Sequence, residues 1–355
     1  MKCIKFTLEE KRIKDFLNLP NKIYSKKNNI ENKKEIEQLL KEEHVLNKYF
    51  SLDKFLIYKN DEVVGRFVIT TYKNDNVAYL GFFECIDDRK VASFLFDNAY
   101  SFCKEKKYKK IVGPVDASFW LKYRLKVNMF DKVPYTGEPY NASYYYKFFK
   151  DNKYTVVEKY KSNIYKKVMD NYDNKKYSER FKLFKDAGYK IEKPDMKEYE
   201  SIVEKIYYMI INLYSSFPIY KEISLDDFQV MFHDYKKIIN PNMIKLCYFK
   251  DELVGFFIGI PNYNNLVYHL ENPFNIIKIL RIKRKPKEYV MLYIGVNPNH
   301  QGLGKALIQS VMMELKKRNL PCIGALAKDG KVTQKYFDDM IEDQYEYVLL
   351  ERRIK

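Results

Sequence analysis

The feature that most constrains the fold of this chain is an internal repeat. The segment 58–65 is similar to the segment 248–255, about 190 residues later, with one gapped position. Each copy is predicted to form a β-hairpin, because a two-residue turn (Asn60-Asp61 or Lys250-Asp251) stands between runs of β-branched and aromatic residues. Two copies of one fold are therefore the simplest prediction for the whole chain.

The order of the predicted elements repeats as well. Each half is expected to contain a short strand, two helices, the hairpin, a longer strand, a long helix, another strand, a short helix and a final strand. Tyr145 is followed nine residues later by Tyr154, and Tyr336 in the same way by Tyr345, each time at the start of a β-rich stretch. Asp, Asn and Lys crowd together in 169–177, and we place the boundary between the halves there.

Length and composition agree with two cores and give an expected compartment. The chain has 355 residues, of which 46% are hydrophobic, so each half can bury a core of its own. The 5 cysteines are odd in number and never form a Cys-x-x-Cys pair, which argues against disulfides and a bound metal. No secretory segment opens the chain, and no apolar run approaches the roughly 18 residues of a membrane span. We expect a cytoplasmic protein with no membrane partner.

The net charge of +17 suggests nucleic acid as a partner, because basic surfaces attract phosphates. Lys, Asn, Tyr and Ile are abundant along the whole chain, however, so much of the excess is background, and nucleic acid is not the favoured partner. The densest basic run is 278–287, inside a segment, 262–288, that the first half lacks. This run either binds the ribose phosphate of a nucleotide cofactor or an anionic acceptor, or it is a solvated loop.

A glycine-rich turn in the second half indicates an anion-binding site. A strand is predicted over 289–296 and a helix over 305–318, and Gly302 and Gly304 lie between them. Glycines let backbone N–H groups approach a ligand closely, and the start of a helix carries a partial positive charge. This turn is therefore predicted to bind a pyrophosphate.

The same residues carry a resemblance to a known family. The order Gln301-x-x-Gly304-x-Ala306, after a strand that ends in Val296-x-Pro298, resembles the coenzyme A binding motif of the GNAT N-acyltransferase superfamily. The resemblance implies acetyl-CoA as the cofactor and places the backbone of Val296 against the pantetheine arm. It assigns the pyrophosphate to the following residues: Gln301, Gly302, Leu303, Gly304, Lys305 and Ala306.

The first half carries a second, related resemblance. The segments 81–84, 113–114 and 135–141 are similar to the amino-terminal part of a family of tandem-GNAT bacterial N-acetyltransferases. This implies an α/β (α+β) fold with two tandem GNAT-like domains, each a mixed, mostly antiparallel sheet flanked by helices. We expect a degenerate domain without a cofactor loop at 1–168, and a GNAT domain with the coenzyme A motif at 177–355.

One donor site per chain is predicted, because the first half lacks the glycine-rich turn. Its counterpart, 82–112, contains no glycine, and Asp87 and Asp88 stand where a pyrophosphate would have to lie. Like charge and side-chain bulk both oppose binding there. The first half is therefore expected to shape the reaction rather than perform it.

For catalysis, the superfamily implies direct attack of an amine on the thioester. Tyr336 is the candidate general acid, although Met340-Ile341 replace the Gly-Phe pair that usually ends this segment. Glu288 is the candidate base, with Glu271 as an alternative, and either can also be an ordinary solvated glutamate. His300 adjoins the turn and can titrate near neutrality, although a histidine in a loop is more often a bystander. The tyrosines at 140 and 144–146 either line an acceptor cleft or pack in a core.

Three classes of function remain open. The first is an N-acyltransferase that moves an acetyl group from acetyl-CoA to an amine of a small molecule or amino acid, with its site in the carboxy-terminal half. The second is a tRNA-dependent aminoacyl transferase of the peptidoglycan-bridge type, a class that usually lacks a working cofactor turn. The third is a non-catalytic module that binds acyl-CoA or nucleic acid.

Overall fold

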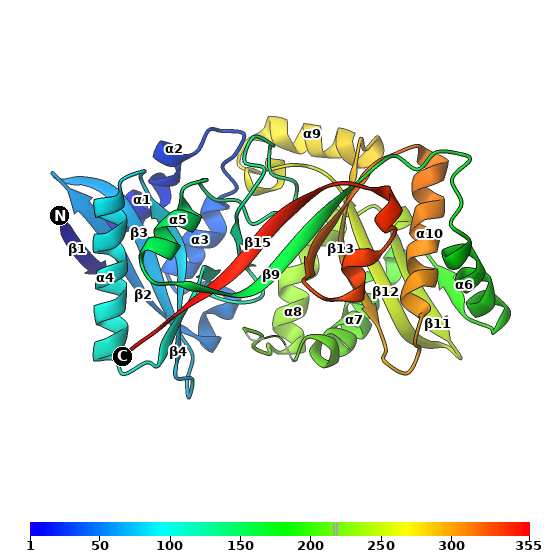
Figure 1. Cartoon of the computed structure of the whole chain (residues 1–355), viewed down its shortest axis with the longest axis horizontal. Helices are drawn as coiled ribbons and strands as arrows, with labels where there is room; N and C mark the ends of the chain where they lie inside the picture. The colour runs from blue at the N-terminus through cyan, green and yellow to red at the C-terminus, as the bar shows by residue number, and fades with distance from the viewer. Residues whose placement is uncertain (216, 218) are drawn as a thin grey trace. The chain divides into compact units, whose positions relative to one another are not determined.

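The computed structural model describes residues 1–215, 217 and 219–355, and the chain folds into two compact units (Figure 1). Unit 1 consists of Met1–Pro134, Glu138–Tyr160 and Glu346–Lys355, and unit 2 consists of Tyr135–Gly137 and Lys161–Tyr345. The last ten residues thus belong to unit 1, whereas the sequence-based range 177–355 assigned them to the second half.

Unit 1 is a mostly antiparallel sheet flanked by helices, in the strand order β1-β2-β3-β4-β5. Its elements are β1 (Lys2–Phe6), α1 (Glu10–Asn18), α2 (Pro20–Ile23), α3 (Lys33–Leu40), β2 (Ser51–Lys59), β3 (Glu62–Thr71), β4 (Val77–Cys85), α4 (Arg89–Glu105), β5 (Lys110–Gly113), β6 (Val115–Asp116), β7 (Lys122–Tyr123), β8 (Leu125–Lys126) and α5 (Tyr145–Asp151). The strand β9 (Thr155–Tyr165) begins in unit 1 and continues into unit 2.

Unit 2 repeats this plan in the strand order β10-β11-β12-β13-β14. Its elements are α6 (Lys175–Asp186), β10 (Lys190–Glu192), α7 (Tyr199–Tyr214), α8 (Leu225–Phe232), β11 (Ile244–Phe249), β12 (Glu252–Pro261), α9 (Pro273–Arg284), β13 (Tyr289–Val296), α10 (Leu303–Arg318) and β14 (Cys322–Lys328). The final strand, β15 (Ile341–Arg353), begins in unit 2 and ends in unit 1.

The two hairpins confirm the internal repeat. Both turn residues of each hairpin have positive φ, at Asn60 and Asp61 in unit 1 and at Lys250 and Asp251 in unit 2. This left-handed pair of residues matches the twist of two antiparallel strands. Each hairpin also shifts its register at the same place, after Ile57 in unit 1 and after Cys247 in unit 2. The copies therefore share their irregularities as well as their order of elements.

The end of the chain completes the sheet of unit 1. In β15, Leu350 pairs with Gly113 and Arg352 with Ile111, so the strand extends the sheet beyond β5. The apolar side of this strand is deeply buried, with Leu350 fully excluded from solvent. No local pattern in 346–353 shows which sheet the strand will join, because its alternation of residues suits either one.

Two sequence-based assignments in unit 2 are corrected by the structure. The predicted helix over Thr333–Ile341 is instead two short 3₁₀ turns, Val332–Lys335 and Asp338–Met340, separated by Phe337 with a φ of 49°. A left-handed residue interrupts an α-helix, so the segment cannot be continuous. The basic run 278–287, for which a solvated loop was one expectation, lies mostly in α9. Among the described residues, no helix is both long and apolar enough to cross a membrane.

Candidate active site

The fourth and fifth strands of unit 2, β13 and β14, are paired at one end and separate at the other, and we call the space between them the wedge. β13 and β14 are parallel and pair from Tyr289–Cys322 to Met291–Gly324, where the pairing ends, although both strands continue. On its other edge, β13 has a bulge at Leu292, because Ile258 pairs with Tyr293 and the next residue, Gly259, with Met291. A bulge bends a strand and increases its twist, so it directs the end of β13 away from β14.

A cleft opens where the two strands separate. It encloses about 610 Å³, open solvent at its mouth included, and its walls are largely apolar. Met291 to Ile294 of β13 form one side, and Gly324, Ala325 and Ala327 of β14 form the other. Ile308, Val311 and Met312 of α10 close the bottom.

The predicted glycine-rich turn leads from this wedge into α10. Gly302 precedes the helix with a φ of 88°, and no side chain caps the first turn. A Cβ on Gly304 would lie 2.4 Å from the Tyr336 hydroxyl and 3.9 Å from Val296 Cγ2. Glycine is therefore the residue that leaves room at the helix start. The uncapped backbone fits an anion, and the apolar cleft beside it fits an extended arm, as coenzyme A requires.

Arg180 reaches the same turn from α6 and was not anticipated from the sequence. Its guanidinium carbon lies 3.4 Å from the position of a Cβ on Gly302. In the described part of the chain, Arg180 has no ion pair. A planar guanidinium beside an uncapped helix start is suited to bind phosphate oxygens. No local motif marks this residue, because only the packing of α6 against α10 brings it to the turn.

Tyr336 lies where the cleft meets the start of α10. Its ring lines the cleft, and its hydroxyl stands over Gly304. The Tyr165 hydroxyl donates a 2.8 Å hydrogen bond to the Tyr336 carbonyl oxygen and fixes the backbone there. Burial, with a smaller contribution from Tyr177, raises the pKa of Tyr336 to about 12. The phenol therefore holds its proton at neutral pH and can donate it.

Glu288 lies apart from the turn. It precedes β13 at the end opposite Val296, and Asn262 Nδ2 donates a 2.5 Å hydrogen bond to its carboxylate. Among the described residues, the side chains that line the cleft do not include Glu288. Glu288 directly precedes Tyr289, which pairs with Cys322, so it lies near the closed end of the wedge. The structure therefore does not bring the two predicted catalytic residues together.

The other site residues suggested by the sequence, a histidine, a glutamate and two of the tyrosines, have contacts with neighbouring side chains or backbone groups. His300 Nδ1 shares a 2.7 Å hydrogen bond with the Tyr189 hydroxyl, and its ring contacts Phe249. Glu271 is largely exposed and lies 3.5 Å from His269. Tyr144 and Tyr145 of unit 1 bond to the backbone of Cys85, as core residues do.

In unit 1, the corresponding helix start is already occupied by a side chain. The Asp88 carboxylate accepts hydrogen bonds from the N–H groups of Lys90 and Val91 at the start of α4, at 2.9 and 3.3 Å. Lys59 forms an ion pair with the same carboxylate at 2.9 Å. The aspartate thus takes the place that a phosphate would need.

The wedge of unit 1 is also filled by the chain itself. β4 and β5 pair only from Val77–Lys110 to Tyr79–Val112. Beyond that point β6 lies against β4, so that a Cβ on Gly81 would come within 1.8 Å of the Val115 carbonyl oxygen. The Asp116 carboxylate accepts a hydrogen bond from the Phe82 N–H. A smaller cavity, lined by residues that include Glu84, Asp116 and Lys122, remains beside this backbone.

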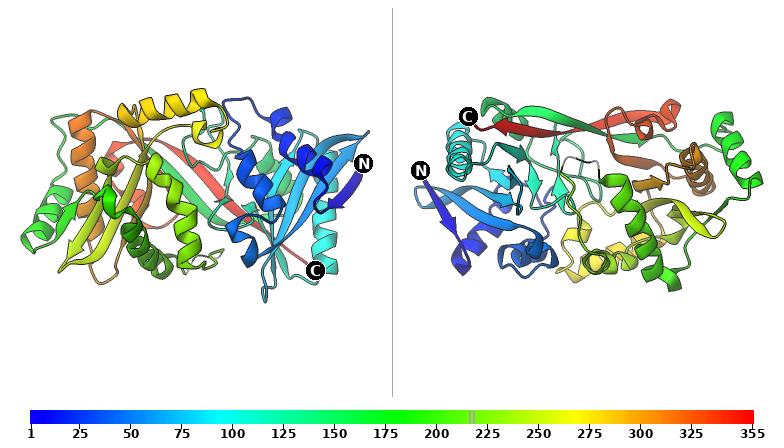
Figure 2. Two further views of the ribbon diagram at one scale, coloured as in Figure 1. Left: turned by 180° about the vertical axis from the view of Figure 1, so that it is seen from behind. Right: turned by 90° about the horizontal axis from the view of Figure 1, so that it is seen from below.

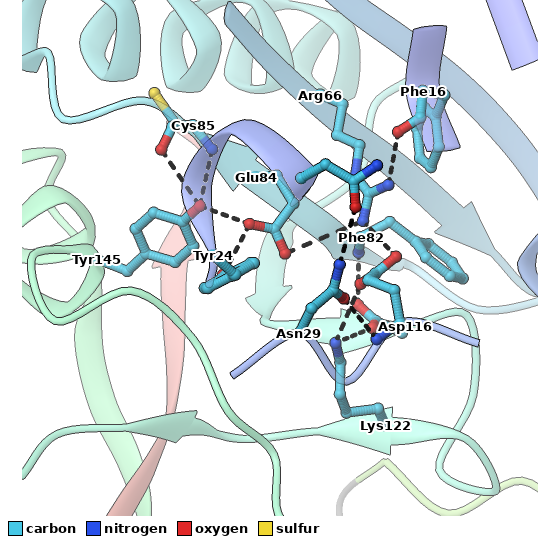
Figure 3. Close-up of polar contacts among 12 residues, drawn as sticks. Phe16, Tyr24, Asn29, Arg66, Phe82, Glu84, Cys85, Asp116, Lys122 and Tyr145 are labelled. Carbon is cyan, nitrogen blue, oxygen red and sulfur yellow. Dashed lines mark hydrogen bonds and ion pairs between the residues drawn. The ribbon is translucent and has the colours of Figure 1, made fainter. Parts of the chain in front are cut away.

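A buried polar cluster surrounds the filled wedge (Figure 3). Glu84 accepts hydrogen bonds from the hydroxyls of Tyr24 and Tyr145, at 2.8 and 2.6 Å. Arg66, fully buried, pairs with Glu31 at 2.7 Å and lies 3.9 Å from Glu84. Because burial outweighs the Arg66 charge, the pKa of Glu84 is raised to about 7.

Residues 207–338 match the Acetyltransferase (GNAT) family, and this range contains the cleft, the glycine-rich turn and Tyr336. The chain therefore carries a GNAT domain. A domain of this family supports acyl transfer in general. Arg180 precedes the residues that match the family. No curated protein matches the chain.

Solved structures share the fold at low identity. A tandem GNAT protein from the clavulanic acid biosynthesis pathway is 10% identical, with 100% of this chain and 98% of that chain covered, at a TM-score of 0.52. A probable N-acyltransferase of Enterococcus faecalis V583 is 9% identical, with 99% of this chain and 72% of that chain covered, at a TM-score of 0.51.

A third structure with this fold is a glucosamine N-acetyltransferase region in a fungal multi-domain β-N-acetylglucosaminidase. It is 12% identical, with 99% of this chain and 38% of that chain covered, at a TM-score of 0.55. At these identities the likeness shows the fold alone. The first of the three structures is a tandem GNAT protein, and the match covers this chain completely.

Proposed function

We propose that this chain is an N-acyltransferase that moves an acetyl group from acetyl-CoA to an amine of a small molecule or amino acid, with its active site in unit 2. The observation that supports this most is the contrast between two equivalent helix starts. The start of α10 is uncapped beside an open apolar cleft, whereas the start of α4 is capped by Asp88 beside a filled wedge.

The residues of unit 2 would divide the work as follows. Acetyl-CoA supplies an acyl group activated as a thioester. The backbone N–H groups of Gly302 to Ala306, with Gln301 beside them, and the Arg180 guanidinium would hold the pyrophosphate. The end of β13 up to Val296 offers backbone groups that β14 does not pair, and these would orient the arm and the acyl carbonyl. Tyr336 would donate its proton to the leaving sulfur.

The proton of the attacking amine needs an acceptor, for which Glu288 stays the prediction. The alternative is that Glu288 has a structural role, because it accepts a hydrogen bond from Asn262 and lies apart from the glycine-rich turn. Glu288→Gln separates the two. A catalytic base would lower turnover at neutral pH and leave the melting temperature alone, whereas a structural carboxylate would lower the melting temperature first.

Calorimetric titration with acetyl-CoA tests the location of the site. We expect one molecule bound per chain. Gly304→Asp should not bind, because its Cβ would lie 2.4 Å from the Tyr336 hydroxyl and its carboxylate would repel phosphate at the helix start. Asp88→Asn is the matched control, since asparagine also caps helices and α4 should bind nothing in either form. A stoichiometry of two, or tight binding by the Gly304 variant, would show that unit 1 holds a working site.

Release of coenzyme A thiol over a panel of amines tests catalysis. Release that depends on the amine supports the transferase, and binding without release supports a non-catalytic acyl-CoA module. Titration with aminoacylated tRNA separates the peptidoglycan-bridge alternative, which predicts tRNA binding and no dependence on Gly304.

A further inference from the structure

The helix α9 carries an unusual solvent face. Five large apolar side chains lie exposed within eleven residues around it, with Phe274 the most exposed at 69%. The others are Leu270, Ile276, Ile277 and Leu280, each about half exposed. The opposite side of the helix is anchored by buried Ile279 and by Asn275, whose amide donates a 2.8 Å hydrogen bond to the His269 carbonyl oxygen. An apolar patch of this kind marks a surface that contacts something other than water.

Basic side chains share this face in a regular pattern. Phe274, Ile277 and Leu280 are each followed four residues later by a basic residue, so that Lys278, Arg281 and Arg284 lie one turn along the same side. All three are exposed, as are Lys285 and Lys287, and no acidic residue occurs between Asn272 and Lys287. Long basic side chains can reach outward while their apolar neighbours insert.

In the described part of the chain, no residue of α9 lines the cleft of the proposed active site. It precedes β13, whereas the glycine-rich turn follows β13, so the length of an eight-residue strand, roughly 25 Å, separates them. The hypothesis that the basic run binds the cofactor is therefore not favoured by the geometry. Unit 1 has no equivalent helix between β3 and β4, where only 72–76 intervene.

We propose that α9 docks unit 2 on an anionic lipid surface. Lipid matches both halves of the pattern, because the apolar side chains enter the acyl boundary while the cations meet the headgroups. A nucleic acid would pair with the cations but leave Ile276, Ile277 and Leu280 against phosphate and water. In Figure 1 and the left view of Figure 2, α9 is the yellow helix, and one of its sides is turned away from the rest of unit 2. This proposal replaces the sequence-based expectation of no membrane partner, which rested on the lack of a membrane-spanning segment, because docking on a lipid surface needs no such segment.

Co-sedimentation of the full chain with vesicles tests this inference. We expect binding to phosphatidylcholine vesicles that contain phosphatidylglycerol, little binding to pure phosphatidylcholine, and partial release by salt, since charge pairing is screened. Combined Phe274→Ser, Ile277→Ser and Leu280→Ser should reduce binding about tenfold or more while the net charge is unchanged. Combined Arg281→Gln, Arg284→Gln and Lys285→Gln should remove the preference for phosphatidylglycerol.

The matched control neutralises three exposed lysines on α6, with Lys176, Lys182 and Lys185 changed to Gln. It loses the same charge as the α9 charge variant but should keep binding within about twofold. Equal loss in the control would assign the binding to overall charge and overturn the proposal. So would absence of vesicle binding at low salt, or α9-dependent binding of RNA in its place. Melting curves confirm that each variant is folded, and no readout depends on coenzyme A.

Discussion

The Tyr336 hydroxyl lies between the cleft and the start of α10, and burial raises its pKa to about 12. We expect Tyr336→Phe to lower turnover by about 10²-fold where chemistry limits the rate, because the leaving sulfur loses its proton donor. Affinity for acetyl-CoA should hardly change. Single-turnover kinetics and calorimetry measure the two effects separately.

Tyr172→Phe is the control for this substitution, since the Tyr172 hydroxyl bonds to Asp339 outside the cleft. It should leave turnover unchanged. If Tyr336→Phe instead weakens binding and spares the chemical step, the hydroxyl belongs to the phosphate site over which it stands.

Arg180 supports a second prediction at this scale. Charge-assisted hydrogen bonds contribute about 1.5–3 kcal/mol, so Arg180→Gln should raise the Kd for acetyl-CoA by about 10–100-fold. Dephospho-coenzyme A keeps the pyrophosphate and should lose affinity equally. Acetyl-pantetheine lacks the pyrophosphate and should bind both proteins alike.

Lys182→Gln removes the same charge from an exposed position on α6 and should have little effect. If dephospho-coenzyme A binds the Arg180 variant as well as it binds the wild type, the guanidinium contacts the ribose phosphate and not the pyrophosphate. If the wild type binds no coenzyme A at all, the proposed function fails before Arg180 is tested.

Among the elements, β4 carries a buried carboxyl group, whereas its counterpart β13 lines the cleft of unit 2. Its Glu84 has a pKa raised to about 7, well above that of an exposed glutamate, because burial outweighs the attraction of Arg66, which lies 3.9 Å away. The folded state therefore binds the proton more tightly than the unfolded state does. Such a group favours folding at low pH, and its contribution declines as the pH rises from about 4.5 to about 7.

Glu84→Gln should remove this decline, because glutamine stays neutral and its oxygen still accepts from Tyr24 and Tyr145. We expect unit 1 of the variant to be more stable than the wild type by about 1–3 kcal/mol near pH 8, and to differ little near pH 5. Trp120 is the single tryptophan and lies in unit 1, so its emission follows denaturation of this unit. A variant less stable near pH 8 would mean that the charged form of Glu84 supports the fold.

At the scale of the whole molecule, the last strand of the chain, β15, packs into unit 1, which the first residues of the chain form. Leu350 is fully buried in the core of unit 1, although it follows all of unit 2 in the sequence. We expect Leu350→Ala to destabilise unit 1 by about 2–5 kcal/mol, as measured by denaturant titration of Trp120 emission. Affinity for acetyl-CoA should stay within about twofold, because the turn and the cleft belong to unit 2.

Arg353→Ala provides the control, since this side chain is 85% exposed at the end of the same strand. It should change stability by no more than about 0.5 kcal/mol. An equal effect of both substitutions would mean that the carboxy-terminal residues contribute little to the core of unit 1.

Local patterns in the sequence determined the repeat, the hairpins and the glycine-rich turn. Asn60-Asp61 and Lys250-Asp251 specify their turns through backbone preferences, and Gly302 specifies its left-handed φ, so neighbouring residues were enough to predict them. Asp88 was anticipated as an obstacle to phosphate, and the structure adds that it caps α4.

The tertiary structure decided what depends on distant partners. Arg180 meets Gly302 only because α6 packs on α10, and Leu350 enters unit 1 only through its pairing with Gly113. The predicted helix at Tyr336 failed because the segment follows its contacts with Tyr165 and Tyr177 rather than its own propensity. Side-chain spacing encodes local geometry, whereas the choice of partner is settled by the packing of the whole chain.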